Sequence, residues 1–448
     1  MKKLLIALGV LVVAGALAGG AVVLSSQEEA TVDIAEQYGP NPKLPEPNPK
    51  LLPTVNQAEA EPWKEGEMPT ASQGFVVNEY AKGLDHPRWL HLLPNGDVLV
   101  AESNKPPQQK NTMSIRRWVA HKIMGSAGAN TPSANRISLL RDQDGDGVAE
   151  TKTVFLKNLF SPFGMTLSNG TLYIANADAI VSVPYQDGQT EITEEPKHIV
   201  DLPAGLNHHW TKDVIASKDG TKLYATVGSN SNVGENGMEN EENRAAVLEI
   251  DLATKAVRLF AGGLRNPNGL SWHPESGELW VVVNERDEIG SDLVPDYMTS
   301  VKDGGFYGWP YSYFGQIVDD RIQPPRPDFV AKAIKPDYAL GSHTASLGLT
   351  FNEGDAFGAE FKNGAFVGQH GSWNREPRSG YKVIFVPFAG GKPNGPPKDI
   401  LTGFLGEDDK ARGRPVGLEI DFKGALLVAD DVGNRIWRVV AGQQSASQ

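Results

Sequence analysis

The sequence predicts an all-β protein, a six-bladed β-propeller that follows an N-terminal signal or anchor segment and a proline-rich spacer. Pairs of short apolar runs joined by Gly-containing turns recur six times after Asp85, and the stretches between them show little helical periodicity. Repeated strand pairs of this kind are typical of sheets arranged radially around an axis. With 448 residues the chain is long enough to form such a ring.

The N-terminus carries two lysines, Lys2 and Lys3, before an uncharged apolar run over residues 4–24. This pattern is typical of a secretory signal or of an uncleaved membrane anchor. Ala16-Leu17-Ala18 offers a small-x-small cleavage site, whereas the whole run is long enough to span a bilayer, so both interpretations stay open. We expect a periplasmic or otherwise extracytoplasmic protein, secreted or tethered to the inner membrane by residues 4–24, with membrane contact only through that segment.

A proline-rich stretch over residues 39–49 is unsuited to a helix or a central strand and is interpreted as an extended spacer. The expected parts are a signal peptide or membrane anchor over 1–27, a proline-rich linker over 28–73, the propeller over 74–442 and a disordered tail over 443–448.

Composition excludes several classes of function. The formal net charge is -13, and no basic stripe exists to neutralise phosphates, so nucleic acid is not expected as a partner. The chain has no cysteine, which excludes disulfides, thiolate chemistry and cysteine-ligated metals. Any metal must therefore be held by oxygen atoms or by imidazole.

Each copy of the repeat begins with a polar loop and continues through an apolar run, a Gly-containing turn and a second apolar run. The copies span residues 86–102, 162–176, 208–227, 266–284, 345–369 and 414–430. Because every first strand begins with a loop at the same end of the ring, we expect the polar residues of these loops to converge on one axial funnel. The set is His208, His209, Arg265, Asn266, His343, His370, Arg412 and Arg414.

Arginine and histidine gathered around one cavity suit a flat, anionic ligand, since guanidinium offers a bidentate fork and stacks on planar rings. Any single arginine could instead brace a loop by bonding carbonyl groups, and a histidine pair taken alone is more often structural. Cations contributed by four loops together favour a ligand.

A separate acidic loop runs from Asp142 to Glu150, with carboxylates at alternate positions, glycines for the sharp turn and a final acid. This spacing of carboxylates is typical of a short calcium-binding loop. The sequence therefore predicts a structural calcium site made by Asp142, Asp144, Asp146 and Glu150, with a plain exposed acidic turn as the alternative.

Four motifs carry a resemblance to a known family. They are His208–Lys212, Gly262–Pro267, Gly304–Pro310 and Gly413–Gly417, with Leu-Arg-Asn-Pro and a downstream Tyr-Gly-Trp-Pro as the more specific pair. These residues resemble the glucose/sorbosone dehydrogenase family, and the sorbosone dehydrogenase branch in particular. The resemblance covers roughly residues 74–440 and implies a soluble six-bladed propeller that uses pyrroloquinoline quinone (PQQ) and calcium.

The resemblance also implies roles for individual residues. His209 would take the proton from the sugar hydroxyl while hydride passes to C5 of the quinone, and His208 stands where the glucose enzymes carry an aspartate. The implied cofactor-binding residues are His208, Arg265 and Asn266, the carboxylate clamp Arg412 and Arg414, and His370, which stands nearest to a lysine of the family's fifth-blade loop.

The family's cofactor calcium is bound by backbone carbonyls after the second strand of the fourth blade. That loop is here residues 284–288, more charged than the family's Gly-Pro version, and Asn284 and Glu285 are the candidate ligands.

Chemistry independent of the resemblance also requires a cofactor. Oxidising an alcohol or a hydrated aldehyde needs a base, a two-electron acceptor and a cation that polarises the acceptor, and no side chain accepts a hydride. The chain has no GxGxxG turn between a strand and a helix, and no cysteine for haem or iron-sulfur attachment. A cofactor bound by loops is consistent with these features.

The predicted function is PQQ-dependent oxidation of a sugar or sugar aldehyde, aldose to lactone or sorbosone-type aldehyde to acid, with electrons leaving to a quinone pool or a cytochrome. Two alternatives stay open. One is a calcium-dependent lactonase or esterase propeller, and the other is a non-catalytic binding propeller, since the fold alone does not separate them.

Overall fold

The structure is a computed structural model that describes residues 28–50, 54–107 and 131–442. The predicted signal or anchor over 1–27 and the predicted tail over 443–448 lie outside the described residues. No helix in the described ranges is both long and apolar enough to cross a membrane.

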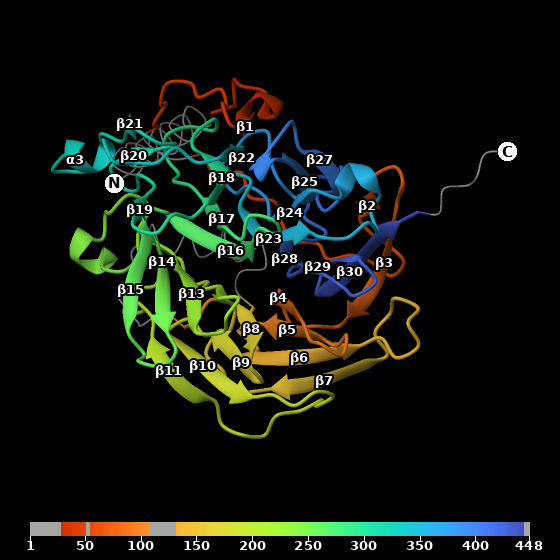
Figure 1. Ribbon diagram of the computed structural model, residues 1–448. Coiled ribbons are helices and arrows are strands. Elements are labelled where there is room, and N and C mark those ends of the chain that lie inside the picture. Colours follow the sequence, from red (N-terminus) through yellow and green to blue (C-terminus); the bar gives the residue numbers. More distant parts are fainter. Residues whose placement is uncertain (1–27, 51–53, 108–130, 443–448) are drawn as a thin grey trace, which may run out of the picture.

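Six β-sheets of antiparallel strands surround a common axis, so the predicted all-β six-bladed propeller is confirmed (Figure 1). Blade 1 contains β4 (Pro87–Leu92), β5 (Val98–Glu102), β6 (Arg136–Arg141) and β7 (Thr151–Leu156). Blade 2 contains β8 (Met165–Ser168), β9 (Thr171–Ala175), β10 (Ala179–Pro184) and β11 (Lys197–Asp201). Blade 3 contains β12 (Val214–Ala216), β13 (Lys222–Val227), β14 (Ala246–Asp251), β15 (Val257–Gly262) and the parallel β19 (Gly305–Phe306).

Blade 4 contains β16 (Asn266–Trp272), β17 (Leu279–Asn284), β18 (Pro295–Ser300), β22 (Tyr338–Ser342) and β1 (Tyr38–Gly39). Blade 5 contains β23 (Ser346–Asn352), β24 (Gly364–Gln369), β25 (Lys382–Ala389), β27 (Lys398–Thr402) and β2 (Thr70–Ala71), with β26 (Lys392–Pro393) beside β25. Blade 6 contains β28 (Pro415–Ile420), β29 (Leu426–Asp430), β30 (Arg435–Ala441) and β3 (Phe75–Lys82).

The remaining elements are short. They are the hairpin of β20 (Ser312–Tyr313) and β21 (Ile317–Val318), the helix α3 (Pro327–Val330), and the 3-10 turns η1 (Ile34–Gln37), η2 (Met238–Glu241) and η3 (Ala359–Phe361).

The ring closes through β3, which precedes the first repeat in sequence but pairs with β30 of the last blade. Val77 lies opposite Val439 in this antiparallel pair. The first and last parts of the propeller thus share one sheet, and opening the ring would break a full strand pairing.

Glycines explain how tightly the innermost strands meet at the axis. A Cβ atom on Gly348 would lie 2.1 Å from the carbonyl oxygen of Val416 in the next blade, and one on Gly417 would lie 2.7 Å from that of Arg88. Gly269 makes the same kind of approach to Leu347. Only a residue without a side chain allows the backbones of neighbouring blades to come so close.

Aromatic and aliphatic side chains fill the space between blades. Trp280 of β17 is fully buried and packs against Phe351 and Phe388 of blade 5. Trp89 of β4 stacks on Phe163, at the entrance to blade 2, with ring centroids 4.5 Å apart. This packing holds the blades at fixed angles, so that the loops at their ends have defined positions.

The predicted linker is partly folded onto the propeller. We call residues 28–50 and 54–63 the N-terminal strap (Figure 1, red to orange). Within it, β1 extends blade 4 by pairing with β22, Ala60 bridges Ala411, and the indole of Trp63 donates to Asp430 at 2.7 Å. Proline limits strand pairing but tolerates a sheet edge, which is where β1 lies. The domain boundary at residue 74 stays a prediction.

Candidate active site at the axial end of the propeller

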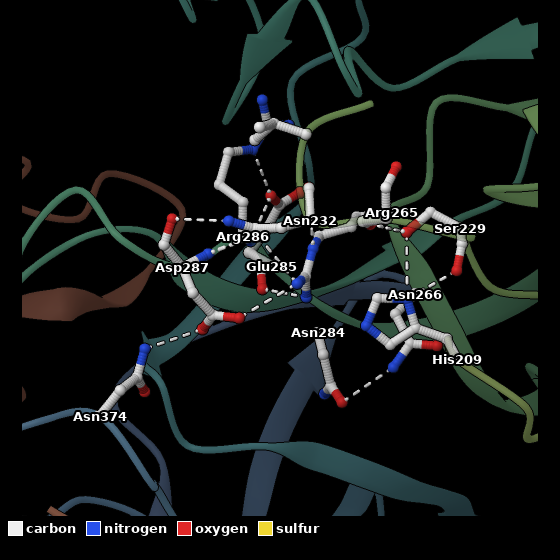
Figure 2. Close-up of polar contacts among 12 residues, drawn as sticks. His209, Ser229, Asn232, Arg265, Asn266, Asn284, Glu285, Arg286, Asp287 and Asn374 are labelled. Atoms are coloured by element: carbon white, nitrogen blue, oxygen red, sulfur yellow. Dashed lines mark hydrogen bonds and ion pairs between the residues drawn. The ribbon is translucent and has the colours of Figure 1, made fainter. Parts of the chain in front are cut away.

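The strand registers bring the predicted loops to one end of the ring. Asn266 pairs with Asn284, Ser346 with Gln369, and Pro415 with Asp430, so each first strand begins beside the end of its second strand. The loops before the first strands and after the second strands therefore share this axial end. Figure 2 shows His209, Asn266 and Arg265 converging there with residues of the 284–287 loop.

His209 is held as a neutral base. Its Nδ1 lies 2.8 Å from the carbonyl oxygen of Ser229 and 3.0 Å from the hydroxyl of the same residue. A carbonyl only accepts, so Nδ1 carries the proton and Nε2 keeps its lone pair. Burial lowers the pKa of His209 well below its usual range, and the charge of Arg265 lowers it further. Among the described residues nothing bonds to Nε2.

His208 is exposed at the rim, and its ring meets that of His209 edge-on at 4.6 Å. The two histidines thus have different environments, one open to solvent and one inside the site.

Asn266 stands beside the base. Its amide nitrogen donates to the Asn284 side chain at 3.3 Å, but its own side-chain oxygen is buried without a hydrogen-bond partner. Gly228 makes this arrangement possible, because a Cβ atom there would lie 2.4 Å from that oxygen and 2.5 Å from Cβ of His209. A buried, unpaired acceptor is costly in a folded protein and is a reason to expect a ligand or water.

Arg265 is almost fully buried, and protein atoms bond to each of its three guanidinium nitrogens. Nη2 donates to the side-chain oxygen of Asn232 at 2.9 Å and pairs with Asp287 at 3.1 Å, while Nη1 donates to the carbonyl oxygen of Glu285 at 2.5 Å. The guanidinium plane is therefore fixed in orientation before any ligand binds.

Asp287 balances the charge of Arg265. Its other carboxylate oxygen accepts from Asn374 at 2.9 Å and lies 3.4 Å from Nδ1 of His343 (Figure 2 shows Asn374 and Asp287). Burial opposes ionisation, but the Arg265 charge and the His343 and Asn374 contacts outweigh it and lower the pKa of Asp287 to about 2. Asp287 is therefore an anion at neutral pH.

The two candidate calcium ligands of this loop are engaged by protein groups. Asn284 bonds to Asn266 and to the carbonyl oxygen of Ser346. The Glu285 carboxylate is buried and pairs with Arg286 at 3.0 Å, and its carbonyl oxygen accepts from Arg265. One carboxylate oxygen of Glu285 is buried without a hydrogen-bond partner. A calcium at this loop stays a prediction.

The extra charges of the loop have a structural explanation. Arg286 is fully buried and donates to Glu285, to Asp319 and to the carbonyl oxygens of Pro310 and Ser312. It fastens the segment around residues 310–319 to the 284–288 loop, and so fixes the Glu285 carbonyl that orients Arg265.

The predicted carboxylate clamp does not come together as one unit. Arg412 lies at the rim, where it pairs with Asp408 at 2.8 Å and with Glu61 of the strap at 3.1 Å. Arg414 is buried, lies over the ring of Tyr381 at 4.8 Å, and points at the carbonyl oxygens of Ala58, His370 and Gly371. In this structure both arginines brace the strap.

His370 contacts a carboxylate that sequence reasoning did not select. Its Nε2 lies 2.9 Å from Asp431, which also pairs with Arg88 and lies 3.4 Å from Nε2 of His86. This cluster joins blades 5, 6 and 1.

The acidic loop folds as a compact turn. Ligand atoms of Asp142, Asp144, Asp146 and Glu150 lie within 4.8 Å of one another. The amides of Gly145 and Gly147 donate to Asp142 at 2.7 and 3.0 Å, which curls the loop around its acids. Oxygen ligands in this arrangement can hold calcium. Since exposed acidic turns also occur without metal, the site stays a prediction.

Comparison with known proteins locates the chain in a family. The model of the family described as "Domain of unknown function (DUF7133)" matches residues 70–372. An "Uncharacterized protein" of Borreliella burgdorferi is 30% identical over 296 residues, 63% of this chain and 76% of that protein. The chain is a member of the DUF7133 family. A second model, described as "TrAA12-like", matches residues 329–442.

Two further matches connect this DUF7133 protein with sugar dehydrogenases. The pyrroloquinoline quinone-dependent pyranose dehydrogenase of Coprinopsis cinerea is 23% identical over 363 residues, 70% of this chain but only 44% of that enzyme. The calcium structure of the Trichoderma reesei AA12 enzyme superposes with a TM-score of 0.67 at 18% identity, covering 88% of this chain and all of that one. The predicted resemblance to PQQ-dependent sugar dehydrogenases is confirmed, and the fold is shared.

The DUF7133 site differs from the expected cation-rich funnel in one respect. Among the described residues, Arg265, Arg286 and Arg88 each form an ion pair with a carboxylate from another part of the chain, namely Asp287, Asp319 and Asp431. The sequence did not show this pairing, because Asp287 and Asp431 follow strands in ordinary polar loops. Asn232 was missed for the same reason, since it belongs to a long polar, Gly-rich stretch.

Unpaired buried polar atoms gather at the same end. Besides Asn266, they include the Nε atoms of Arg88 and Arg414 and single oxygens of Asn374 and Asp431. These unpaired atoms include both hydrogen-bond donors and hydrogen-bond acceptors. Because buried polar groups are normally hydrogen-bonded, this concentration marks the axial end as the place where a polar ligand fits.

Proposed function

We propose that this protein is a PQQ-dependent dehydrogenase that oxidises a sugar or sugar aldehyde at the axial end of the propeller. The observation that carries the proposal is His209, a neutral imidazole with an unbonded Nε2 beside the unpaired oxygen of Asn266 and the oriented guanidinium of Arg265. The name of the Coprinopsis relative, a pyrroloquinoline quinone-dependent pyranose dehydrogenase, supports the reaction class.

The residues present fit a flat quinone with carboxylate substituents. Arg265 offers a planar cation, Asn266 an unpaired acceptor, and Arg414 an unpaired buried Nε. His208 and His370 would add contacts at the rim and on the wall, and Arg412 would contribute at the rim. A carboxylated ligand would add negative charge beside Asp287 and Asp431, so its binding is expected to depend on these ion pairs.

The bound quinone supplies the acceptor of two electrons that the side chains lack. His209 Nε2 accepts the proton of the substrate hydroxyl. The hydrogen on the same carbon leaves with the two electrons of the C–H bond as hydride, and the C=O bond forms. The Ser229 carbonyl holds the imidazole in the correct tautomer. Arg265 and Asn266 orient the reactants. An aldose would give a lactone, and a hydrated sorbosone-type aldehyde would give an acid.

Calcium is proposed at two places. Asp142, Asp144, Asp146 and Glu150 would hold a structural ion. The carbonyl group of Glu285, whose oxygen also accepts from Arg265, and Asn284 beside it would hold a cofactor-site ion. The proposed location is extracytoplasmic, with residues 4–24 as leader or tether, and electrons would pass to a quinone pool or a cytochrome.

A calcium-dependent lactonase is the second candidate. It would need several carboxylate or amide side chains facing the axis, and Asn266, Asn374 and Asp287 meet there. Asp287 is committed to Arg265 and His343, which favours the dehydrogenase. The third candidate is a propeller that binds a ligand without catalysis.

One assay separates these candidates. Purified protein is loaded with calcium and PQQ and tested with aldoses, pyranoses and sorbosone for reduction of a redox dye; lactones are offered in parallel without quinone. Dye reduction that requires both quinone and sugar is expected. Lactone hydrolysis without quinone, or quinone that neither binds nor turns over, would contradict the proposal.

A further inference from the structure

His370 and Asp431 form a histidine-carboxylate pair at the axial end that the proposed proton abstraction by His209 does not use. Nε2 of His370 lies 2.9 Å from Oδ2 of Asp431. Burial opposes ionisation of Asp431, but the surrounding His370, His86 and Arg88 outweigh it and hold the pKa of this carboxyl far below the usual range. An ionised carboxylate only accepts, so Nε2 of His370 carries the proton and Nδ1 carries the lone pair.

His370 is partly exposed, with 21% of its side chain accessible to water. In the described ranges no hydrogen bond is made to its Nδ1. Burial lowers the pKa of the imidazole although Asp431 opposes this, so the ring is neutral near pH 7 and able to accept a proton. The charged or titratable groups that face it are Asp431, Arg414, Arg88 and His86.

The pair and His209 belong to different loops of the axial end. His209 precedes blade 3, whereas His370 follows the second strand of blade 5 and Asp431 that of blade 6. Arg88, which pairs with Asp431, lies 5.7 Å from the ring of Trp210, the residue next to His209. A ligand held at this end would therefore lie among loops that carry both imidazoles.

We propose that His370, oriented by Asp431, is the proton acceptor for reoxidation of the reduced cofactor, separate from the proton abstraction by His209. This inference rests on the proposed function. When bound, the quinone would take up two electrons and two protons per sugar oxidised, and its return to the oxidised form would send the electrons to an external one-electron acceptor and release the protons. Nδ1 of His370 would accept these protons one after the other and pass each to water.

The pair has a tautomer signature that needs no cofactor. Histidine labelled with 15N should show His370 in the Nε2-H form, with Nδ1 as the titrating nitrogen. Asp431→Asn should change the tautomer ratio. A His370 that shows equal tautomers or no response to Asp431→Asn would overturn the positioning role of Asp431.

The kinetic test separates the two half-reactions of the quinone-loaded protein. In His370→Gln saturated with quinone, reoxidation by a ferricyanide or phenazine acceptor should slow about 10²-fold, far more than anaerobic reduction of the bound quinone by sugar. Reoxidation in wild type should also slow at acidic pH, as Nδ1 becomes protonated. The variant should lose this dependence.

The control is His198→Gln, which removes the imidazole of an exposed histidine-carboxylate pair on β11, where Nε2 lies 2.8 Å from Asp201. It should leave both half-reactions unchanged. Unchanged reoxidation in His370→Gln, or equal slowing of both half-reactions, would overturn the inference while leaving the dehydrogenase intact. A wild-type protein that never binds quinone would overturn the proposed function, and this inference with it.

Discussion

At the scale of single residues, the account depends on His209. His209→Ala removes the only proposed acceptor of the substrate proton, so turnover should fall about 10²- to 10⁴-fold while the quinone still binds. Steady-state dye reduction and a spectrum of the bound quinone measure the two effects. His198→Ala, on the outer strand β11, is the matched control and should keep full turnover. Unimpaired turnover in the His209 variant would mean that the base lies elsewhere.

The pH profile tests the environment of the same residue. In the proposed mechanism the neutral form of His209 is the active one, and burial together with the Arg265 charge lowers its pKa well below 6.5. Activity should therefore persist as the pH falls through 6.5 and be lost only at more acidic values. The measurement is kcat/KM for sugar against pH. An acid limb centred at or above 6.5 would show that the imidazole is more hydrated than the structure indicates.

Individual candidate residues could be selected from the sequence where polar side chains coincide with the repeat. His209, Arg265 and Asn266 were selectable because they stand at the starts of first strands. Their partners were not, because nothing in the sequence shows that Asp287 pairs with Arg265, or Asp431 with Arg88. Pairing in the folded chain depends on loop conformation, which a polar, Gly-rich segment does not reveal.

At the scale of strands, glycines at the axis are the testable feature. Gly348→Ala would place a Cβ atom 2.1 Å from the Val416 carbonyl oxygen, so blades 5 and 6 must move apart. Overpacking of this kind costs about 1–3 kcal/mol of unfolding free energy. Thermal or denaturant unfolding measures the loss. Gly354→Ala is the control, because the nearest atom to its added Cβ is 3.9 Å away; equal stability of the two variants would contradict the described axial packing.

The inner strands were predictable from sequence and the edges were not. Two apolar runs around a glycine turn identify β16 and β17 or β28 and β29. By contrast, β1 pairs with β22 and β3 with β30, and each of these partners lies hundreds of residues away in the chain. Such pairings depend on ring closure and leave no local pattern, which explains why the strap was interpreted as a spacer.

At the scale of the whole molecule, calcium should stabilise the propeller. An ion bound at Asp142, Asp144, Asp146 and Glu150 adds about 2.7 kcal/mol when its concentration is one hundred times Kd. A chelator should therefore lower Tm by a few degrees, and added calcium should restore it. Asp146→Asn should abolish the response, whereas Glu195→Gln, at an exposed acid between β10 and β11, should keep it. If Tm does not change when calcium is added or removed, the loop is a simple acidic turn without a bound ion.

The closed ring explains why the candidate site could not be recognised in any single blade. No single blade carries the chemistry, since His209, Arg265 and His370 come from three different loops that only the closed ring brings to one end. Two changes would alter the site without touching His209. One removes the contact of Arg414 with the strap, and the other removes the ion pair between Arg265 and Asp287.

The most direct test is the absorption spectrum of quinone bound to the protein, recorded anaerobically before and after one equivalent of sugar. The account predicts that sugar converts the oxidised spectrum to the reduced one in wild type and that the conversion is at least 10²-fold slower in His209→Ala. A bound quinone that stays oxidised with every sugar, or that is reduced equally fast in both proteins, would contradict it.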